Sequence, residues 1–235
     1  MFTKEAVKKF LYFDVETAGA YPDVATLHNQ NHRLWELWQK REKYYRGAYS
    51  ELETLDSDEI FKQKAGLEPE FSKIVCVSFG SFTDEGEMRF ISFYGPDETD
   101  ILTKSSKVLN NAASKGWKLC GHHIKGFDVP CLGKRMVYNQ INPPAIIRVW
   151  DKKPWEIPYV DTSEVFSFGS WVQQKYISLD LLACSLNILS PKALMDGSMV
   201  HARFWSDVDL ETIKDYCELD VKTVMQVMDK VCFEN

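Results

Sequence analysis

The sequence lacks the features that mark exported, membrane-spanning and nucleic-acid-coating proteins. No apolar run approaches the roughly 20 residues that a membrane-spanning helix needs, and the run at 10–13 is too short for the core of a signal peptide. The 34 acidic and 28 basic residues give a net charge of −6, which argues against binding nucleic acid through bulk positive charge, although a local groove can still bind it. We therefore expect a cytoplasmic protein.

Short motifs of several enzyme classes are absent as well. The six cysteines never form a C-x-x-C pair and are scattered mostly through apolar segments, so we expect reduced thiols in the core. The chain also has no glycine-rich phosphate loop, no serine-nucleophile motif and no set of zinc ligands. Any chemistry must therefore come from other side chains.

The chain does have enough apolar residues for a substantial core. Of its 235 residues, 45% are hydrophobic and 13% are aromatic, which suits one globular domain over 1–235. The apolar pattern predicts strands at 8–13, 73–79, 87–93, 117–120 and 157–161, and helices at 97–114, 127–140, 179–189 and 206–231. A strand, a hairpin and then alternating helices and strands are typical of an α/β fold with a mixed sheet.

Segment 21–68 differs in character and predicts a helical insertion after the first strand. Within it, 31–46 places Leu34, Trp38 and Tyr45 on one helical face and carries five basic residues against two acidic ones. One interpretation is a helix that grips single-stranded nucleic acid through charge and stacking. The alternative is a helix packed on the core with a solvated basic face.

Three separate segments carry acidic residues where apolar ones are expected. Asp14 and Glu16 follow the first strand and point to the same side of it, so their like charges are costly unless a cation lies between them. The alternative is that the strand has ended and both acids are solvated. Asp128 begins a predicted helix after Phe127, where it serves either in a site or as an N-cap.

The third acid lies on the last predicted helix. At 100° per residue, Asp220 falls on the apolar stripe with Ile213 and Val224, and Tyr216 is one turn before it on the same face. A buried carboxylate needs a metal, a cation or a proton, so the alternative to a site is a core salt bridge. Four carboxylates from three segments favour Mg²⁺ or Mn²⁺, and a pair of such ions is the usual apparatus for phosphodiester cleavage.

In this order the three segments resemble the motifs of the DEDD 3′–5′ exonucleases, which have an RNase H-like fold. The first motif, D-x-E, matches Asp14 and Glu16, and the second, an acid after an aromatic residue, matches Asp128. The third motif, Y-x-x-x-D, matches Tyr216 and Asp220 and marks the tyrosine subgroup.

A closer resemblance is to the predicted exonucleases related to the proofreading domain of family-B DNA polymerases. It rests on the stretches 67–74, 178–182 and 190–192 as well as on the motifs, and it extends from about residue 10 to 231. The resemblance implies a central five-stranded mixed sheet flanked by helices, two Mg²⁺ or Mn²⁺ ions, and removal of nucleotides from a 3′ end.

The resemblance also implies roles for particular residues. Four acids would hold the two metals, with Asp14 between them, and Tyr216 would orient the attacking water; the acids are Asp14, Glu16, Asp128 and Asp220. Three residues are expected at the substrate, namely Thr17, Lys192 and His123, which replaces the family's usual Asn. His122 and His201 are expected to be structural.

Together these expectations predict a metal-dependent exonuclease that acts on the 3′ end of single-stranded DNA. A polymerase or a repair protein is the expected partner. Two alternatives stay open at this point. One is a 3′–5′ exoribonuclease, and the other is a non-catalytic nucleic-acid-binding module of the same fold.

Overall fold

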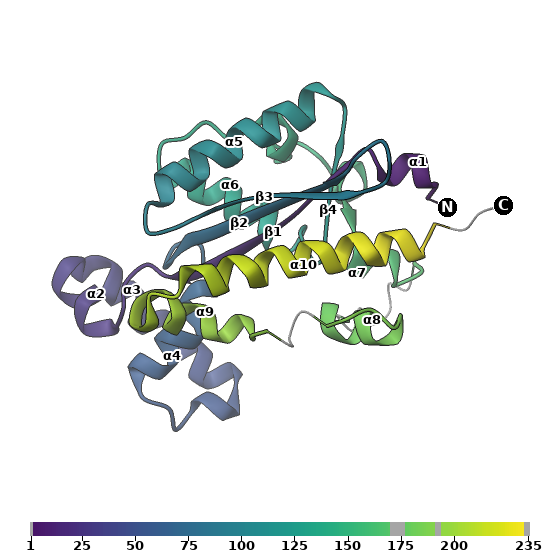
Figure 1. The fold of residues 1–235 in the computed structure, drawn as a ribbon. Coiled ribbons are helices and arrows are strands. Elements are labelled where there is room, and N and C mark those ends of the chain that lie inside the picture. Colours follow the sequence, from purple (N-terminus) through teal and green to yellow (C-terminus); the bar gives the residue numbers. More distant parts are fainter. Residues whose placement is uncertain (1, 170–176, 191–193, 233–235) are drawn as a thin grey trace.

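A five-stranded mixed sheet runs through the centre of the molecule (Figure 1). The computed structural model describes residues 2–169, 177–190 and 194–232. In spatial order the strands are β3 (Met88–Tyr94), β2 (Ser72–Phe82), β1 (Phe10–Gly19), β4 (Lys118–Gly121) and β5 (Val160–Asp161). The three strands from β3 to β1 pair antiparallel, whereas β4 pairs parallel with both β1 and β5. This sheet confirms the predicted fold class.

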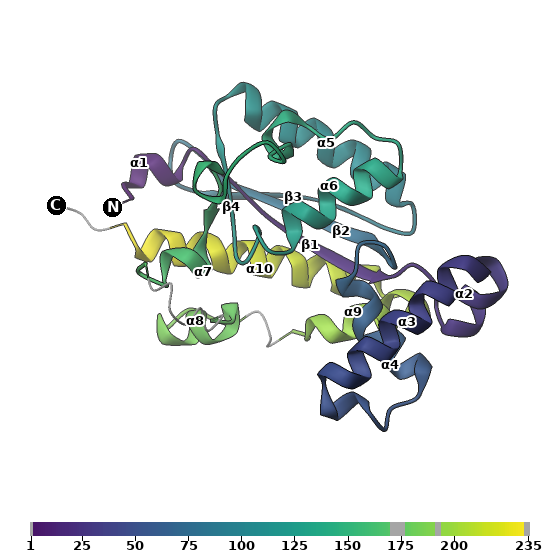
Figure 2. The ribbon, with the colours of Figure 1, turned by 180° about the vertical axis from the view of Figure 1, so that it is seen from behind.

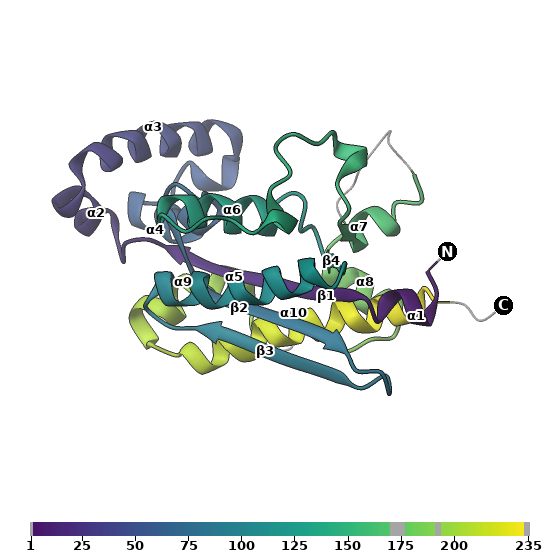
Figure 3. The same ribbon diagram turned by 90° about the horizontal axis from the view of Figure 1, so that it is seen from above.

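Helices cover both faces of the sheet (Figures 1 and 3). Helices α5 (Glu98–Ser114) and α6 (Asp128–Tyr138) lie on one face, and α10 (Leu210–Lys230) crosses the other. Strand β1 contributes side chains to the core on both faces of the sheet. Leu11 and Phe13 pack on the α5 side, whereas Tyr12 packs with apolar residues of α10. A central strand that is buried on both faces reads as a continuous apolar run, as residues 10–13 do.

Shorter elements complete the fold. The remaining α-helical segments outside the insertion are α1 (Lys4–Val7), α7 (Thr162–Val165), α8 (Leu179–Ser185) and α9 (Val200–Ala202). Single 3₁₀ turns occupy Ala145–Ile147, Pro154–Glu156 and Gly197–Met199, and a π-helical turn occupies Arg203–Asp207. Among the described residues, no helix combines the length and apolarity that spanning a bilayer requires.

Strand β1 is longer than predicted, which changes the setting of the first acidic motif. The sequence predicts that the strand stops at residue 13, but β1 continues to Gly19, so Asp14 and Glu16 lie within it. Pairing with β2 extends to the end of the strand, where Gly19 lies opposite Ser72. The pairing skips one residue of β2 between the partners of Glu16 and Thr17, an irregularity that often re-aims side chains beside active sites. The backbone hydrogen bonds between β1 and β2 therefore outweigh the polarity of Asp14 and Glu16, which predicted the end of the strand.

Three helix ends also differ from the predictions. Helix α10 begins at Leu210 rather than 206, because the Asp209 side chain accepts the N–H of Thr212 as an N-cap. Helix α6 ends before the left-handed residue Gln140, and α8 ends before the left-handed residue Asn187. A left-handed residue stops a right-handed helix, but periodicity alone does not reveal it.

The segment between β1 and β2 is helical (Figure 2), and it has its own small core of buried side chains. It contains α2 (Val24–Gln30), α3 (His32–Ala48) and α4 (Ser57–Lys64), with 3₁₀ turns at Ser50–Leu52 and Ala65–Leu67. Trp38 of α3 is fully buried against Phe61 and Phe71. This packing favours the structural interpretation of α3 over that of a free nucleic-acid grip.

Ion pairs engage part of the basic face of α3. The Arg41 guanidinium binds the Glu68 carboxylate, and Arg46 donates to Glu42 at 2.6 Å. These cations are therefore partly neutralised within the insertion.

Candidate active site

The sheet topology brings the three acidic segments to one place. Asp14 and Glu16 lie on β1, and Asp128 opens α6 after β4, the parallel neighbour of β1. Asp220 lies on α10, which packs across the face of β1 toward which Asp14 points. The electrostatics show the convergence, because Asp14, Asp128 and Asp220 all raise the pKa of the Glu16 carboxyl.

Glu16 is the most unusual member of this group. Its side chain is only 8% exposed, yet no residue of the described chain hydrogen-bonds or ion-pairs with its carboxylate. Burial is the largest cause of its raised pKa, followed by the neighbouring charge of Asp14. A buried carboxylate in this state is costly when ionised, so it calls for a cation.

Asp14 is half-buried and has a thiol as its neighbour. The Cys217 thiol donates to Asp14 Oδ2 at 3.4 Å and lies 3.5 Å from its carbonyl oxygen. Burial raises the pKa of Asp14 from its ordinary value of 3.8 to about 6, and the thiol hydrogen bond acts in the opposite direction. One ligand atom each from Asp14, Glu16 and Cys217 lie within 4.8 Å of one another, which is close enough for all three to bind one ion.

Asp128 is tied directly to the first motif. Its Oδ1 accepts the backbone N–H of Val15 at 3.1 Å, and its side chain is 4% exposed. Phe127 occupies the N-cap position of α6, so Asp128 is the first helical residue and not the cap. Burial, and then the charge of Asp14, raise the pKa of its carboxyl well above the ordinary range.

Tyr216 and Asp220 lie one turn apart on α10, and both are buried. Burial, the charges of Asp220 and Glu16 and a side-chain hydrogen bond with Asp220 raise the pKa of Tyr216. The phenol therefore keeps its proton at neutral pH and acts as a hydrogen-bond donor. Sequence reasoning placed both residues on the buried stripe, and the structure finds them there.

The carboxylates fit hard divalent cations. Carboxylate oxygens are the ligands that Mg²⁺ and Mn²⁺ prefer, and the four acids carry more negative charge than this buried space accommodates alone. Burial is the largest cause of the raised pKa values of Asp14, Glu16 and Asp128, and neighbouring carboxylates raise those of Glu16 and Asp128 further.

A cleft of about 610 Å³ opens beside Glu16. Its wall includes Thr17, Phe127 and the insertion residues Lys62 and Lys64. The Thr17 hydroxyl donates to the carbonyl of Gly66 at 2.7 Å, so its proton is already engaged within the protein. A ligand in the cleft can still contact the hydroxyl oxygen or the backbone of this residue.

His123 is exposed and has a left-handed backbone, with φ of 59°. Asn, Asp and His tolerate this conformation better than other side chains, so a change between Asn and His preserves the local backbone. The ring lies over Gly126, since a Cβ at that position would be only 2.4 Å from Nε2 of His123. Lys192, the third expected substrate residue, lies outside the described residues.

The two histidines expected to be structural have both ring nitrogens engaged. His122 contacts the Thr162 hydroxyl and the Ile177 carbonyl, each at 2.8 Å. His201 accepts the N–H of Gly19 at 3.1 Å and lies 3.0 Å from the Pro22 carbonyl. Burial lowers the pKa of both residues, which suits neutral, structural imidazoles.

Sequence reasoning missed Asp161, which holds the loop of the second motif. Its carboxylate is buried and accepts the backbone N–H groups of His123 at 2.8 Å and Lys125 at 3.2 Å. It also accepts the N–H and hydroxyl of Ser163. An acid at the end of a predicted buried strand was the available signal, as it was for Asp14.

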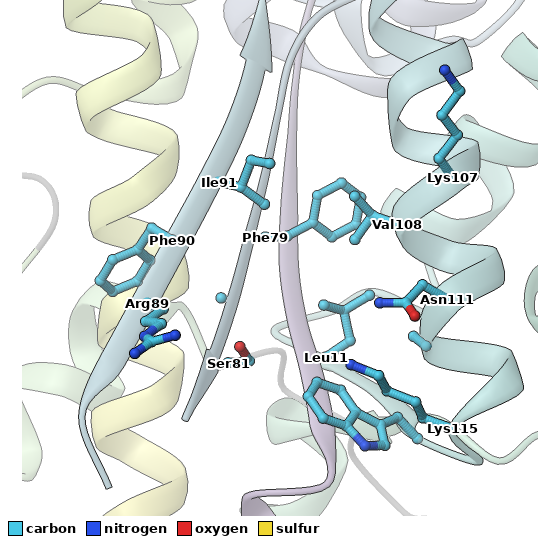
Figure 4. Close-up of a pocket in the computed structure, with 13 residues that line it drawn as sticks. Leu11, Phe79, Ser81, Arg89, Phe90, Ile91, Lys107, Val108, Asn111 and Lys115 are labelled. Atoms are coloured by element: carbon cyan, nitrogen blue, oxygen red, sulfur yellow. The ribbon is translucent and has the colours of Figure 1, made fainter. Parts of the chain in front are cut away.

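A second cavity, of about 440 Å³, lies between β3 and α5 (Figure 4). Its wall includes Phe79, Arg89, Lys107 and Lys115. None of the described residues that line it is acidic, so it offers no carboxylate for a metal. The clustered carboxylates place the candidate active site at the cleft beside Glu16.

Comparisons with known proteins agree with this architecture. The chain is similar in structure to the family B DNA polymerase of the hyperthermophilic archaeon Pyrobaculum calidifontis, with a TM-score of 0.55 at 14% sequence identity. The match covers 94% of this chain and 24% of the polymerase, so the chain spans about a quarter of that protein's length. No curated protein is similar enough in sequence to be matched to this chain.

The sheet and its structural match define the class, an α/β protein with the RNase H-like fold of polymerase exonuclease domains. Residues 66–230 match the model of a family described as predicted 3′–5′ exonucleases related to the exonuclease domain of PolB. The chain belongs to this family.

Proposed function

We propose that the protein is a metal-dependent enzyme that removes nucleotides from the 3′ end of single-stranded DNA by a two-metal mechanism. One observation carries the proposal: Glu16 is buried among three further carboxylates, and its carboxylate has no hydrogen-bond or ion-pair partner among the described residues. Membership of a family of predicted 3′–5′ exonucleases supports cleavage from a 3′ end and a nucleic-acid substrate. The relation to a proofreading domain favours DNA over RNA.

Asp14, Glu16, Asp128 and Asp220 would hold two Mg²⁺ or Mn²⁺ ions. When bound, such ions lower the pKa of a water and stabilise the leaving oxygen of the phosphodiester. The Tyr216 phenol keeps its own proton, so it orients the attacking water by hydrogen bonding and does not act as the base that deprotonates the water. The hydrogen bond from the Val15 N–H holds the Asp128 carboxylate beside the first motif.

The cleft beside Glu16 would take the 3′-terminal nucleotide. Thr17 and Phe127 contribute a polar and an aromatic wall, and Lys62 and Lys64 place positive charge where a phosphate would lie. We expect His123 and Lys192 to contact the substrate strand as well. A polymerase or a repair protein in the cytoplasm is the proposed partner.

The test uses matched 5′-labelled single-stranded DNA and RNA oligonucleotides with Mn²⁺, Mg²⁺ or EDTA. We expect a ladder that shortens from the 3′ end, depends on the metal and forms faster on DNA. Faster cleavage of RNA would make the protein an exoribonuclease. If folded protein binds Mn²⁺ but cleaves neither strand, the result contradicts the proposal and favours a binding module.

A further inference from the structure

Among the described residues beside Asp14 and Glu16, Cys217 is a potential metal ligand that is not an oxygen. Cys217 follows Tyr216 on α10, is fully buried and carries a free thiol. Its sulfur faces the carboxylate of Asp14, and the distance from Cys217 Sγ to Asp14 Oδ2 is 3.4 Å. We propose that Cys217, Asp14 and Glu16 form a binding site for a thiophilic divalent cation such as Zn²⁺ or Cd²⁺, and that this ion inhibits the proposed nuclease.

The spacing of the three ligand atoms matches the coordination of such an ion. Zinc–sulfur and zinc–oxygen bonds of about 2.3 and 2.1 Å, at a tetrahedral angle, place sulfur and oxygen about 3.6 Å apart. The observed 3.4 Å between Cys217 Sγ and Asp14 Oδ2 is close to that separation. An atom of Glu16 lies within 4.8 Å of both, so one ion reaches all three ligands with little rearrangement.

Glu16 is an independent indication that a cation belongs in this space. Its buried carboxylate has no hydrogen-bond or ion-pair partner among the described residues, although it lies beside both other ligands. Burying such a group is favourable only when a proton or a cation accompanies it. Cys217 itself needs no cation, because its hydrogen bond to Asp14 satisfies the thiol.

The thiol determines which ions bind here. Thiolate sulfur prefers Zn²⁺ and other soft or borderline ions, whereas Mg²⁺ binds oxygen ligands. Binding replaces the S–H bond with a metal–sulfur bond, and the proton passes to solvent, so no oxidant or reductant takes part. The bound ion would occupy two of the four carboxylates proposed to hold Mg²⁺ or Mn²⁺, and inhibition follows from that competition.

The inhibitory effect rests on the proposed function, whereas the binding does not. The test is therefore a titration of the metal-free protein with Cd²⁺, followed by the ultraviolet charge-transfer absorption of a cadmium–thiolate bond. The wild-type protein is compared with Cys217→Ser, which removes the ligand, and with Cys184→Ser, which removes an exposed thiol elsewhere.

We expect the absorption band in the wild-type protein and in Cys184→Ser and its loss in Cys217→Ser, with a fall of about tenfold or more in Cd²⁺ affinity. The fall in Mn²⁺ affinity should be smaller, because Mn²⁺ binds oxygen ligands. Circular dichroism and retained Mn²⁺ binding show that the variant is folded, and Cys217→Ala serves if the serine variant is not.

Three results would overturn the inference. They are a band that persists in folded Cys217→Ser, a band that depends on Cys184, and Cd²⁺ binding to the wild-type protein without any band. Wild-type protein that shows the band but cleaves neither DNA nor RNA would contradict the proposed function alone. Zn²⁺ should also inhibit Mn²⁺-dependent cleavage by the wild-type protein, which links the site to activity.

Discussion

The backbone N–H of Val15 donates a 3.1 Å hydrogen bond to the carboxylate of Asp128, 113 residues further along the chain. This contact joins the first acidic motif on β1 to the second at the start of α6. It engages the Oδ1 atom of Asp128. The candidate site is thus assembled by the parallel pairing of β1 and β4, which places the start of α6 beside the acids of β1.

Replacing Asp220 with Asn should abolish cleavage without unfolding the protein. The substitution keeps the side-chain volume but removes one of the four charges proposed to hold the ions, so we expect a loss of about 10³-fold or more. Gel assays of nucleotide release measure the loss. Asp215→Asn, an exposed acid on the same helix, is the matched control and should retain activity. Near-normal metal-dependent cleavage by Asp220→Asn would refute the site.

The stability of the metal-free protein should depend on Asp14. Burial raises its pKa from 3.8 to about 6, so the folded state binds this proton more tightly than the unfolded state does. The resulting stabilisation is present below pH 4 and is lost as the pH rises to about 6, a change of about 3 kcal/mol. Asp14→Asn does not titrate and should gain stability relative to the wild-type protein over this range.

Urea unfolding in EDTA at several pH values measures this difference. Adding Mn²⁺ at pH 7.5 should stabilise the wild-type protein more than Asp14→Asn, because the ion compensates the buried charge. A stability difference that stays constant from pH 4 to pH 7 would show that Asp14 does not carry the raised pKa.

Removing Lys62 should weaken substrate binding more than it slows catalysis. Lys62 is exposed on the wall of the cleft beside Glu16, where its charge would attract the phosphates of the proposed substrate. We expect Lys62→Ala to raise KM for single-stranded DNA by about tenfold, to change kcat little and to reduce the salt dependence of binding by about one phosphate contact. Lys40→Ala is the control, because Lys40 is exposed on α3 and does not line this cleft. Equal effects of the two substitutions would show that Lys62 of α4 does not contact the substrate.

Asp161→Asn should loosen the loop that carries the second motif. The carboxylate accepts the N–H groups of His123 and Lys125, whereas an Asn amide turns one acceptor into a donor that faces an N–H. We expect a loss of about 1–3 kcal/mol in the free energy of unfolding and weaker Mn²⁺ binding. Ser163→Ala, which removes only the serine hydroxyl bond to Asp161, should cost less. Unchanged stability in Asp161→Asn would show that these hydrogen bonds do not hold the loop.

Much of the fold could be predicted because its elements are strongly periodic. The apolar runs of β1 and β2 and the stripe of α10 depend on local patterns that a sequence displays directly. The end of β1 could not be predicted, since Asp14 and Glu16 read as the end of a strand while pairing with β2 continues to Gly19. Local polarity does not report a ladder with a strand more than fifty residues away.

The acids of the candidate site were predictable, whereas their surroundings were not. Asp220 could be predicted because it lies on the apolar stripe of α10, and its spacing to Tyr216 is visible in the sequence. The thiol of Cys217 beside Asp14, and Lys62 in the cleft, depend on how α10 and the insertion pack against β1. Such contacts between distant segments leave no periodic signal.

The most direct measurement follows a 5′-labelled single-stranded DNA oligonucleotide on a gel, with the wild-type protein and Glu16→Gln side by side, in Mn²⁺ and in EDTA. The proposed function predicts a ladder shortening from the 3′ end only for the wild-type protein in Mn²⁺. An intact oligonucleotide with folded, Mn²⁺-loaded wild-type protein, or equal cleavage by Glu16→Gln, would contradict it.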